Sequence, residues 1–159
     1  DIDGDAVRQA AANMQCCPWP ERLRAVQCDF LQWHDEVDAI VCNPPYFTRS
    51  LRCPDAARSL ARHDDSLPLG LLAAHASEVL REGGALCVVL PADVTFSPAG
   101  MALRRRCMVC GAEKKKPKRQ LLEFVKGEVV QLAEERLVLT TPDGRFTADH
   151  QALTDMFYL

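Results

Sequence analysis

Short apolar runs alternate with stretches of helix-forming residues along the first two thirds of the chain. Apart from Asp38, the runs Val37 to Cys42 and Ala85 to Leu90 are apolar, which is typical of strands covered on both faces of a sheet. Around them the pattern predicts helices over Asp5 to Gln15, Pro68 to Leu80 and Ser97 to Arg106, and a short strand over Arg24 to Cys28. Helices that alternate with buried strands indicate an α/β fold with a doubly wound, mostly parallel sheet.

Polar residues, glycines and prolines mark the expected ends of these elements. Asp5 is the expected cap of the first helix, and Gly83-Gly84 the expected end of the second. Asn43-Pro44-Pro45-Tyr46 ends the first buried strand, because two prolines cannot continue a central strand. The polar stretch from Phe47 to Leu67 is predicted as a long loop.

In the last third of the chain, strands follow one another around turns. Arg106 to Cys110 and Gln120 to Val125 flank a run of lysines, and Arg136 to Thr140 precedes the turn Pro142-Asp143-Gly144, after which Arg145 and Phe146 pair back. These strands predict an antiparallel hairpin at the C-terminal edge of the sheet. The chain then finishes with a short helix predicted near Asp149 to Phe157.

Length and composition predict a single globular domain over residues 1–159. No apolar run approaches the roughly 18 residues that a membrane span needs, and the chain does not open like a signal peptide. Most of the eight cysteines lie in apolar runs, which is typical of free thiols, and the CxxC pair Cys107 and Cys110 has no second pair to complete a metal site. We therefore expect a cytoplasmic protein with no membrane partner and no metal.

The net charge of −3 hides a strongly basic segment. Residues 104–119 contain eight basic side chains and one acid, so they carry +7 while the rest of the chain carries −10. A basic patch on an acidic body fits contact with nucleic acid, although a solvated loop and helix end explains the same pattern. The candidate nucleic-acid contacts are Lys114, Lys115, Lys116, Lys118 and Arg119.

Asn43 follows a predicted buried strand, where open α/β sheets bind their ligands. Its side-chain carbonyl and the carbonyl of Pro44 suit the two N–H groups of a planar amine, and together they would hold its nitrogen against an electrophile. Pro44 and Pro45 stiffen the turn, while Tyr46, with Phe47 beside it, offers a flat face for stacking an extruded base. An ordinary turn with two prolines is the alternative interpretation.

The tetrapeptide Asn43-Pro44-Pro45-Tyr46 resembles the catalytic motif of S-adenosylmethionine-dependent amino methyltransferases of the Rossmann-like class. Asp1-Ile2-Asp3 and Asp29-Phe30-Leu31 resemble two further motifs of that class, which hold the cofactor's ribose and adenine. The resemblance implies that Asp1, Ile2, Asp29, Phe30 and Asn43 bind S-adenosylmethionine, since a carboxylate accepts two hydrogen bonds from a diol. The alternative roles are a helix cap for Asp1 or Asp3 and a solvated loop acid for Asp29.

Longer stretches narrow the resemblance to bacterial tRNA (adenine-N(6))-methyltransferases, which modify the adenine beside the anticodon of a valine tRNA. The matching stretches are Pro18 to Arg22, Asp29 to Trp33, Asn43 to Phe47, Val88 to Pro91, Arg119 to Phe124 and Ala152 to Leu159. The resemblance implies methyl transfer to the exocyclic amine of that adenine, with tRNA as the partner, and we expect a monomer. Amino methyltransferases of ribosomal RNA, DNA or protein glutamine use similar tetrapeptides and stay open as alternatives.

The glycine-rich loop that holds the methionine part of the cofactor in this class has no match in the sequence. In the class that loop follows the first strand, and Asp1 resembles the end of the second. We therefore expect the first strand and its loop to precede Asp1, and the 159 residues alone to be poorly stable and unable to hold the cofactor. A truncated, inactive remnant of such a domain is the non-enzyme alternative.

Overall fold

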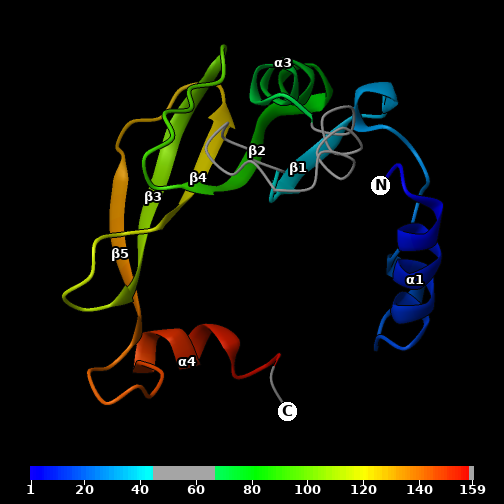
Figure 1. Ribbon diagram of the computed structural model, residues 1–159. Coiled ribbons are helices and arrows are strands. Elements are labelled where there is room, and N and C mark those ends of the chain that lie inside the picture. The colour runs from blue at the N-terminus through cyan, green and yellow to red at the C-terminus, as the bar shows by residue number, and fades with distance from the viewer. Residues whose placement is uncertain (45–66, 158–159) are drawn as a thin grey trace, which may run out of the picture. The chain divides into compact units, whose positions relative to one another are not determined.

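The computed structural model describes residues 1–44 and 67–157 (Figure 1), so most of the predicted loop from Phe47 to Leu67 lies outside the described residues. The chain divides into two compact units, Asp1–Asp35 and Glu36–Leu159. The described elements are α1 (Gly4–Gln15), two short 3-10 turns (Pro20–Arg22 and Phe30–Gln32), β1 (Val37–Cys42), α3 (Leu69–Val79), β2 (Leu80–Pro91), β3 (Met101–Ala112), β4 (Arg119–Lys126), β5 (Ala133–Thr140) and α4 (Ala148–Thr154).

The first unit confirms the predicted helix near its start but not the strand that was expected after it. The carboxylate of Asp3, rather than Asp5, caps α1, because it accepts hydrogen bonds from the backbone of Asp5 (2.7 Å) and Ala6 (3.2 Å). The segment from Arg24 to Cys28 is not a strand. It is tied to Asp1 by two backbone hydrogen bonds, which are too few to build a ladder.

The second unit contains a five-stranded sheet in the order β1-β2-β4-β3-β5. Two pairings are parallel, β1 with β2 and β3 with β5, and the two around β4 are antiparallel. The α/β class is therefore confirmed, with a mixed sheet. The hairpin of β3 and β4 lies inside the sheet, and β5 forms the edge beside it (Figure 1).

The core lies between α3 and one face of the sheet. Side chains of β2 alternate, so that Leu86, Val88 and Leu90 are buried on the same side as Leu122 and Phe124 of β4. The α3 residues that complete this core are Leu72, Ala76 and Val79. The expectation that β1 is covered on both faces is wrong for the described residues, because none of its side chains is buried and Val41 is 83% exposed.

Two predicted boundaries differ from the structure near the sheet. The stretch from Ser97 to Arg106 is not a helix, because residues from Met101 onward form β3, which pairs with β4 and β5. These two ladders outweigh the helix propensity of its alanine, leucine and arginines. The pair Gly83-Gly84 does not end α3 but lies within β2, where Gly83 has the left-handed φ of 77° that favours glycine.

The C-terminal elements follow the sequence prediction closely. The backbone of Thr141 donates to the carbonyl of Arg145 at 2.8 Å, and Thr140 pairs with Phe146, so the chain turns back as expected. Thr147 then caps α4. Helix α4 lies beside the sheet face opposite α3, since Ala152 and Leu153 line a hollow there together with sheet residues. No helix in the described parts of the chain combines the length and apolar character of a membrane span.

Candidate active site

Asn43 and Pro44 come directly after Cys42, the last residue of β1. Asn43 is exposed, whereas the side chain of Pro44 is fully buried and anchors the chain as it leaves the sheet. A residue before proline is restricted to extended conformations, so the position of Asn43 is fixed from both sides. The other residues of the predicted acceptor site, Pro45, Tyr46 and Phe47, lie outside the described residues.

The topology brings the ends of three further strands into one row with Asn43. This row of strand ends crosses the sheet, and we call it the sheet edge of Asn43. Because β1 and β2 are parallel, Asn43 and Pro91 both follow the same edge. Pro91 pairs with Arg119, the first residue of β4, and Arg119 pairs on its other side with Val109 near the end of β3. The turn that joins β3 to β4 therefore lies at the edge that carries Asn43.

The buried side chain of Gln120 organises the backbone at this edge. Its amide nitrogen donates to the carbonyl of Pro91 at 3.0 Å and to that of Val94 at 2.6 Å, so it fixes the chain that leaves β2. The backbone of Ala92 also donates to the carbonyl of Lys118 at 3.2 Å. No sequence signal pointed to Gln120, because its partners lie more than twenty residues away along the chain.

The predicted nucleic-acid contacts gather in this turn, residues 113–118, which we call the lysine turn. All of its lysines are exposed: Lys114, Lys115, Lys116 and Lys118. The backbone of Lys115 donates to Ala112, and that of Lys118 to Val109, each at 3.0 Å. No ion pair among the described residues involves these lysines, so their charges face solvent. Arg119 follows as the first, exposed residue of β4.

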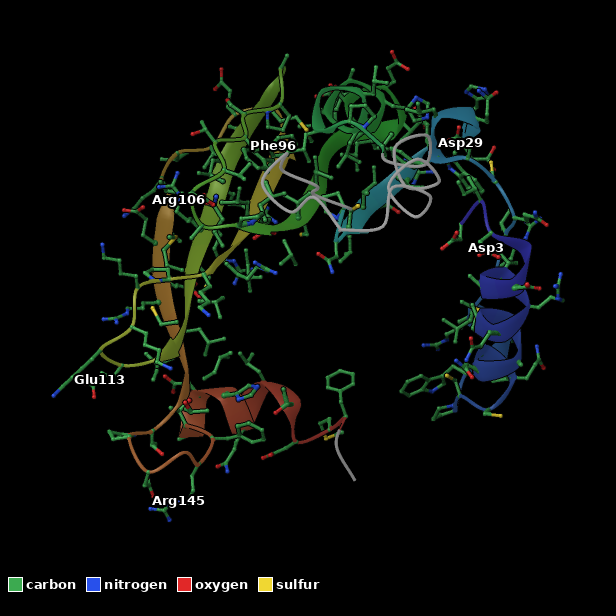
Figure 2. All side chains as sticks on the ribbon, in the orientation of Figure 1. Asp3, Asp29, Phe96, Arg106, Glu113 and Arg145 are labelled. Carbon is green, nitrogen blue, oxygen red and sulfur yellow. The ribbon has the colours of Figure 1, made fainter. Side chains whose placement is uncertain are left out.

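The three arginines at the start of the basic segment form a separate cluster on the sheet. Glu123 of β4 receives hydrogen bonds from Arg104 and, at 3.0 Å, from Arg105, and its side chain is only 14% exposed. The hydrogen bond from Arg104 and then that from Arg105 lower the pKa of Glu123, against the opposing effect of burial. Arg106 pairs with Glu134 of β5 at 3.3 Å. Figure 2 shows Arg106 on the sheet and Glu113 on the lysine turn.

The first unit places four of the five predicted cofactor-binding residues on two hydrogen-bonded segments, and the fifth, Asn43, lies in the second unit. The amino group of Asp1 donates to Val26 at 3.2 Å, and the backbone of Cys28 donates to Asp1 at 2.9 Å, so Asp1-Ile2 runs beside the segment that leads into Asp29-Phe30. One carboxylate oxygen of Asp29 accepts from the backbone of Leu31 at 3.0 Å. A carboxylate has about four acceptor positions, so this capping role leaves Asp29 able to bind a ligand as well.

The cysteine pair of the CxxC spacing does not form a site on the sheet. Cys107 and Cys110 lie three residues apart on β3, and alternate residues of a strand face opposite sides. Burial raises the pKa of the Cys107 thiol. Among residues 1–44 and 67–157, no group of three or more His, Cys, Asp or Glu side chains is arranged to hold a metal ion.

Comparison with known proteins decides the family. The model of the UPF0020 family, an RMKL-like methyltransferase domain, matches residues 1–110. The tRNA1(Val) (adenine(37)-N6)-methyltransferase of Tolumonas auensis is 37% identical over 166 residues, a match that covers 100% of this chain and 70% of that protein. The enzyme of the same name from Phocaeicola vulgatus is 35% identical, over 100% of this chain and 71% of that protein. The chain belongs to the family of tRNA1(Val) (adenine(37)-N6)-methyltransferases.

A solved structure supports the fold of the methyltransferase independently. A predicted O-methyltransferase from Agrobacterium tumefaciens superimposes with a TM-score of 0.67, over 98% of this chain and 74% of that one, at 15% sequence identity. At this identity the likeness concerns the fold alone. It agrees with the α/β architecture that places Asn43 and the lysine turn at one edge of the sheet.

Proposed function

We propose that this methyltransferase transfers a methyl group from S-adenosylmethionine to the exocyclic amine of the adenine beside the anticodon of a valine tRNA. The observation that carries the proposal is the shared sheet edge of Asn43 and the lysine turn, since it combines a grip for a planar amine with a surface for phosphates. The printed names of the relatives support the choice of tRNA and of adenine N6. A tRNA substrate also agrees with the expected cytoplasmic location.

Asn43 holds the acceptor amine in this proposal. The amine of adenine is a weak nucleophile because its lone pair is delocalised into the ring. Two carbonyls, from the Asn43 side chain and the Pro44 backbone, accept its N–H groups and aim the nitrogen lone pair. The buried ring of Pro44 keeps both acceptors in place. Tyr46 and Phe47, which are assigned from sequence, stack on the extruded base.

The residues of the first unit fit a donor that contains a nucleoside. Asp1 and Asp29 each supply a carboxylate, and Ile2 and Phe30 each supply an apolar side chain next to it, within one hydrogen-bonded segment. Such a set suits a ribose diol and a flat adenine ring. S-adenosylmethionine, when bound, supplies an electrophilic methyl group on its sulfonium. We assign cofactor binding to these residues of the first unit.

The lysine turn binds the tRNA backbone. Its four lysines and Arg119 present a cluster of positive charge that neutralises phosphates without reading sequence. Because the turn lies at the edge of Asn43, phosphate contacts there hold the tRNA while the target adenine leaves its stack. The methylated amine then loses its extra proton to water, since a ring-conjugated ammonium is strongly acidic.

Replacement of Asn43 tests the proposal. In the complete enzyme, we expect Asn43→Ala to lower the rate of methylation of unmodified valine tRNA by about 100-fold or more, as is typical when one positioned hydrogen-bond group is removed from an active site. Asn13→Ala, the same change at an exposed position of α1, is the matched control and keeps the rate. Incorporation of a labelled methyl group is the readout, with a thermal melt of each variant. A fall of less than tenfold contradicts the assigned grip.

A further inference from the structure

We propose that Arg136 of β5 is a positioning residue that fixes the lysine turn in the shape that meets the tRNA phosphates. The inference rests on the proposed function, because it assigns a support to the surface that binds the nucleic acid. Arg136 lies outside the basic segment of the sequence, and neither the sequence motifs nor the acceptor site involves it.

Arg136 reaches the turn along the neighbouring strand. β5 runs parallel to β3, and Arg136 pairs with Met108. From there its Nη2 donates to the backbone carbonyl of Glu113, the first residue of the turn, at 2.6 Å, and its Nε donates to the Sγ of Cys110 at 3.4 Å. The guanidinium therefore spans from the end of β3 to the turn, where Figure 2 shows Glu113.

A second side chain of β5 holds the same hairpin end. The hydroxyl of Thr140 donates to the carbonyl of Gly111 at 2.7 Å. Together with the bond from Arg136, β5 thus fixes two carbonyls within three residues, Gly111 and Glu113. The turn's own backbone bonds, from Lys115 and Lys118, fix its remaining part. The lysine turn is therefore anchored to β5 as well as to the two strands that it joins.

A turn of this composition gains from such an anchor. Four lysines within five positions repel one another, and an unsupported turn spreads into many conformations. Ordering those conformations on the tRNA would subtract from the binding free energy, whereas an ordered turn avoids that cost. Arg136 donates to the backbone carbonyl of Glu113, so this brace engages none of the lysine side chains that would meet the phosphates.

A double-mutant cycle separates positioning from direct contact with tRNA. The variants are Arg136→Ala, the triple change of Lys114, Lys115 and Lys116 to alanine, and their combination, each measured for affinity to unmodified valine tRNA at several salt concentrations. We expect Arg136→Ala to weaken binding about fivefold in the unchanged protein, because the turn must then be ordered on binding. In the triple-lysine background we expect Arg136→Ala to weaken binding by less than about twofold, since the surface that it positions is gone.

Two further variants exclude simpler explanations. Arg136→Lys keeps the charge but cannot donate to both Glu113 and Cys110, so we expect it to weaken tRNA binding as much as Arg136→Ala does. At least one of the two variants should keep the melting temperature of the unchanged protein. Arg145→Ala removes an exposed arginine from the turn after β5 and is expected to leave tRNA binding unchanged.

The possible results distinguish a positioning role of Arg136 from a direct contact with tRNA. Equal effects of Arg136→Ala in both backgrounds, or full binding by Arg136→Lys, would mean that Arg136 contacts the tRNA as a charge, which overturns the proposal. Full binding by Arg136→Ala in the unchanged protein overturns it too, while the tRNA-binding role of the lysine turn still stands. If the triple-lysine variant itself binds normally, the fault lies in the proposed tRNA surface, and the positioning role falls with it.

Discussion

Arg104 to Arg106 and the lysine turn are neighbours in sequence and equally basic, yet they lie in opposite environments. The arginines stand on β3 and pair with carboxylates of β4 and β5, whereas the lysines stand on an exposed turn and form no ion pair within the described residues. The basic segment of the sequence therefore forms two separate clusters of positive charge in the structure. One of them is largely neutralised by the sheet, and only the other faces a polyanion.

The residue types match these two environments. The guanidinium suits charge-assisted hydrogen bonds to a carboxylate on a neighbouring strand, and Glu123 accepts one such bond from Arg104 and one from Arg105. Lysine is a hydrated point charge on a flexible stem, which suits non-specific contact with phosphates. The arginines would thus stabilise the fold, and the lysines would bind tRNA, although charge patterning alone does not distinguish them.

The largest effect that sharpens this contrast is on tRNA binding. Changing Lys114, Lys115 and Lys116 to alanine should weaken the affinity for tRNA more than tenfold at low salt and reduce the slope of log K against log salt by about 2 to 3, at roughly 0.7 to 0.9 per phosphate contact. Affinity measured over a salt series checks this. The matched change, Arg104 and Arg106 to alanine, should leave the slope unaltered. An equal loss of slope in both variants would erase the distinction between the two clusters.

The next effect is on stability and concerns Glu123. Glu123→Gln removes the carboxylate shared by two arginines, and we expect a loss of about 1 kcal/mol in the free energy of unfolding, because the carboxylate is partly buried and both guanidiniums reach solvent. For a chain of this length that corresponds to about 2 to 4 °C in melting temperature. Glu134→Gln, at a side chain 64% exposed, is the control and should cost much less. Equal melting temperatures of the two variants would show that the shared carboxylate contributes nothing special.

The same contrast explains what the sequence did and did not predict about the fold. Ala102 to Arg106 has helix-forming composition, and a helix was the natural prediction, but pairing with β4 and with β5 makes this segment part of β3. The ladder and its ion pairs join residues about 20 to 30 positions apart, so no local pattern contains them. In contrast, β1, the buried part of β2 and the turn at Asp143 were predictable, because continuous apolar runs and turn residues act locally.

The same distinction between local patterns and long-range contacts applies to the candidate site. The position of Asn43 after a strand could be predicted, since prolines ended the apolar run at that point. The roles of Gln120 and Arg136 could not, because each acts through backbone carbonyls that the topology alone brings within reach. Asp3 and Asp29 show that a residue of a predicted cofactor-binding motif can also have a local structural role. Each caps a helical turn in the structure. A helix cap is the alternative that the sequence offers for Asp3, whereas for Asp29 the sequence offers only a solvated loop acid.

The smallest effect is the pH dependence of the arginine cluster. Arg104, followed by Arg105, holds the pKa of Glu123 below its ordinary value in the folded protein. A carboxyl with a lowered folded pKa stabilises the protein fully above its unfolded pKa, about 4.3, and this contribution is lost as the pH falls through the folded pKa. The difference in melting temperature between the unchanged protein and Glu123→Gln should thus be constant from pH 7 to pH 5 and shrink below about pH 4. Thermal melts across that range measure it. A difference that persists undiminished at pH 3 would mean that packing of the Glu123 side chain, and not its charge, stabilises the β3–β4 pair.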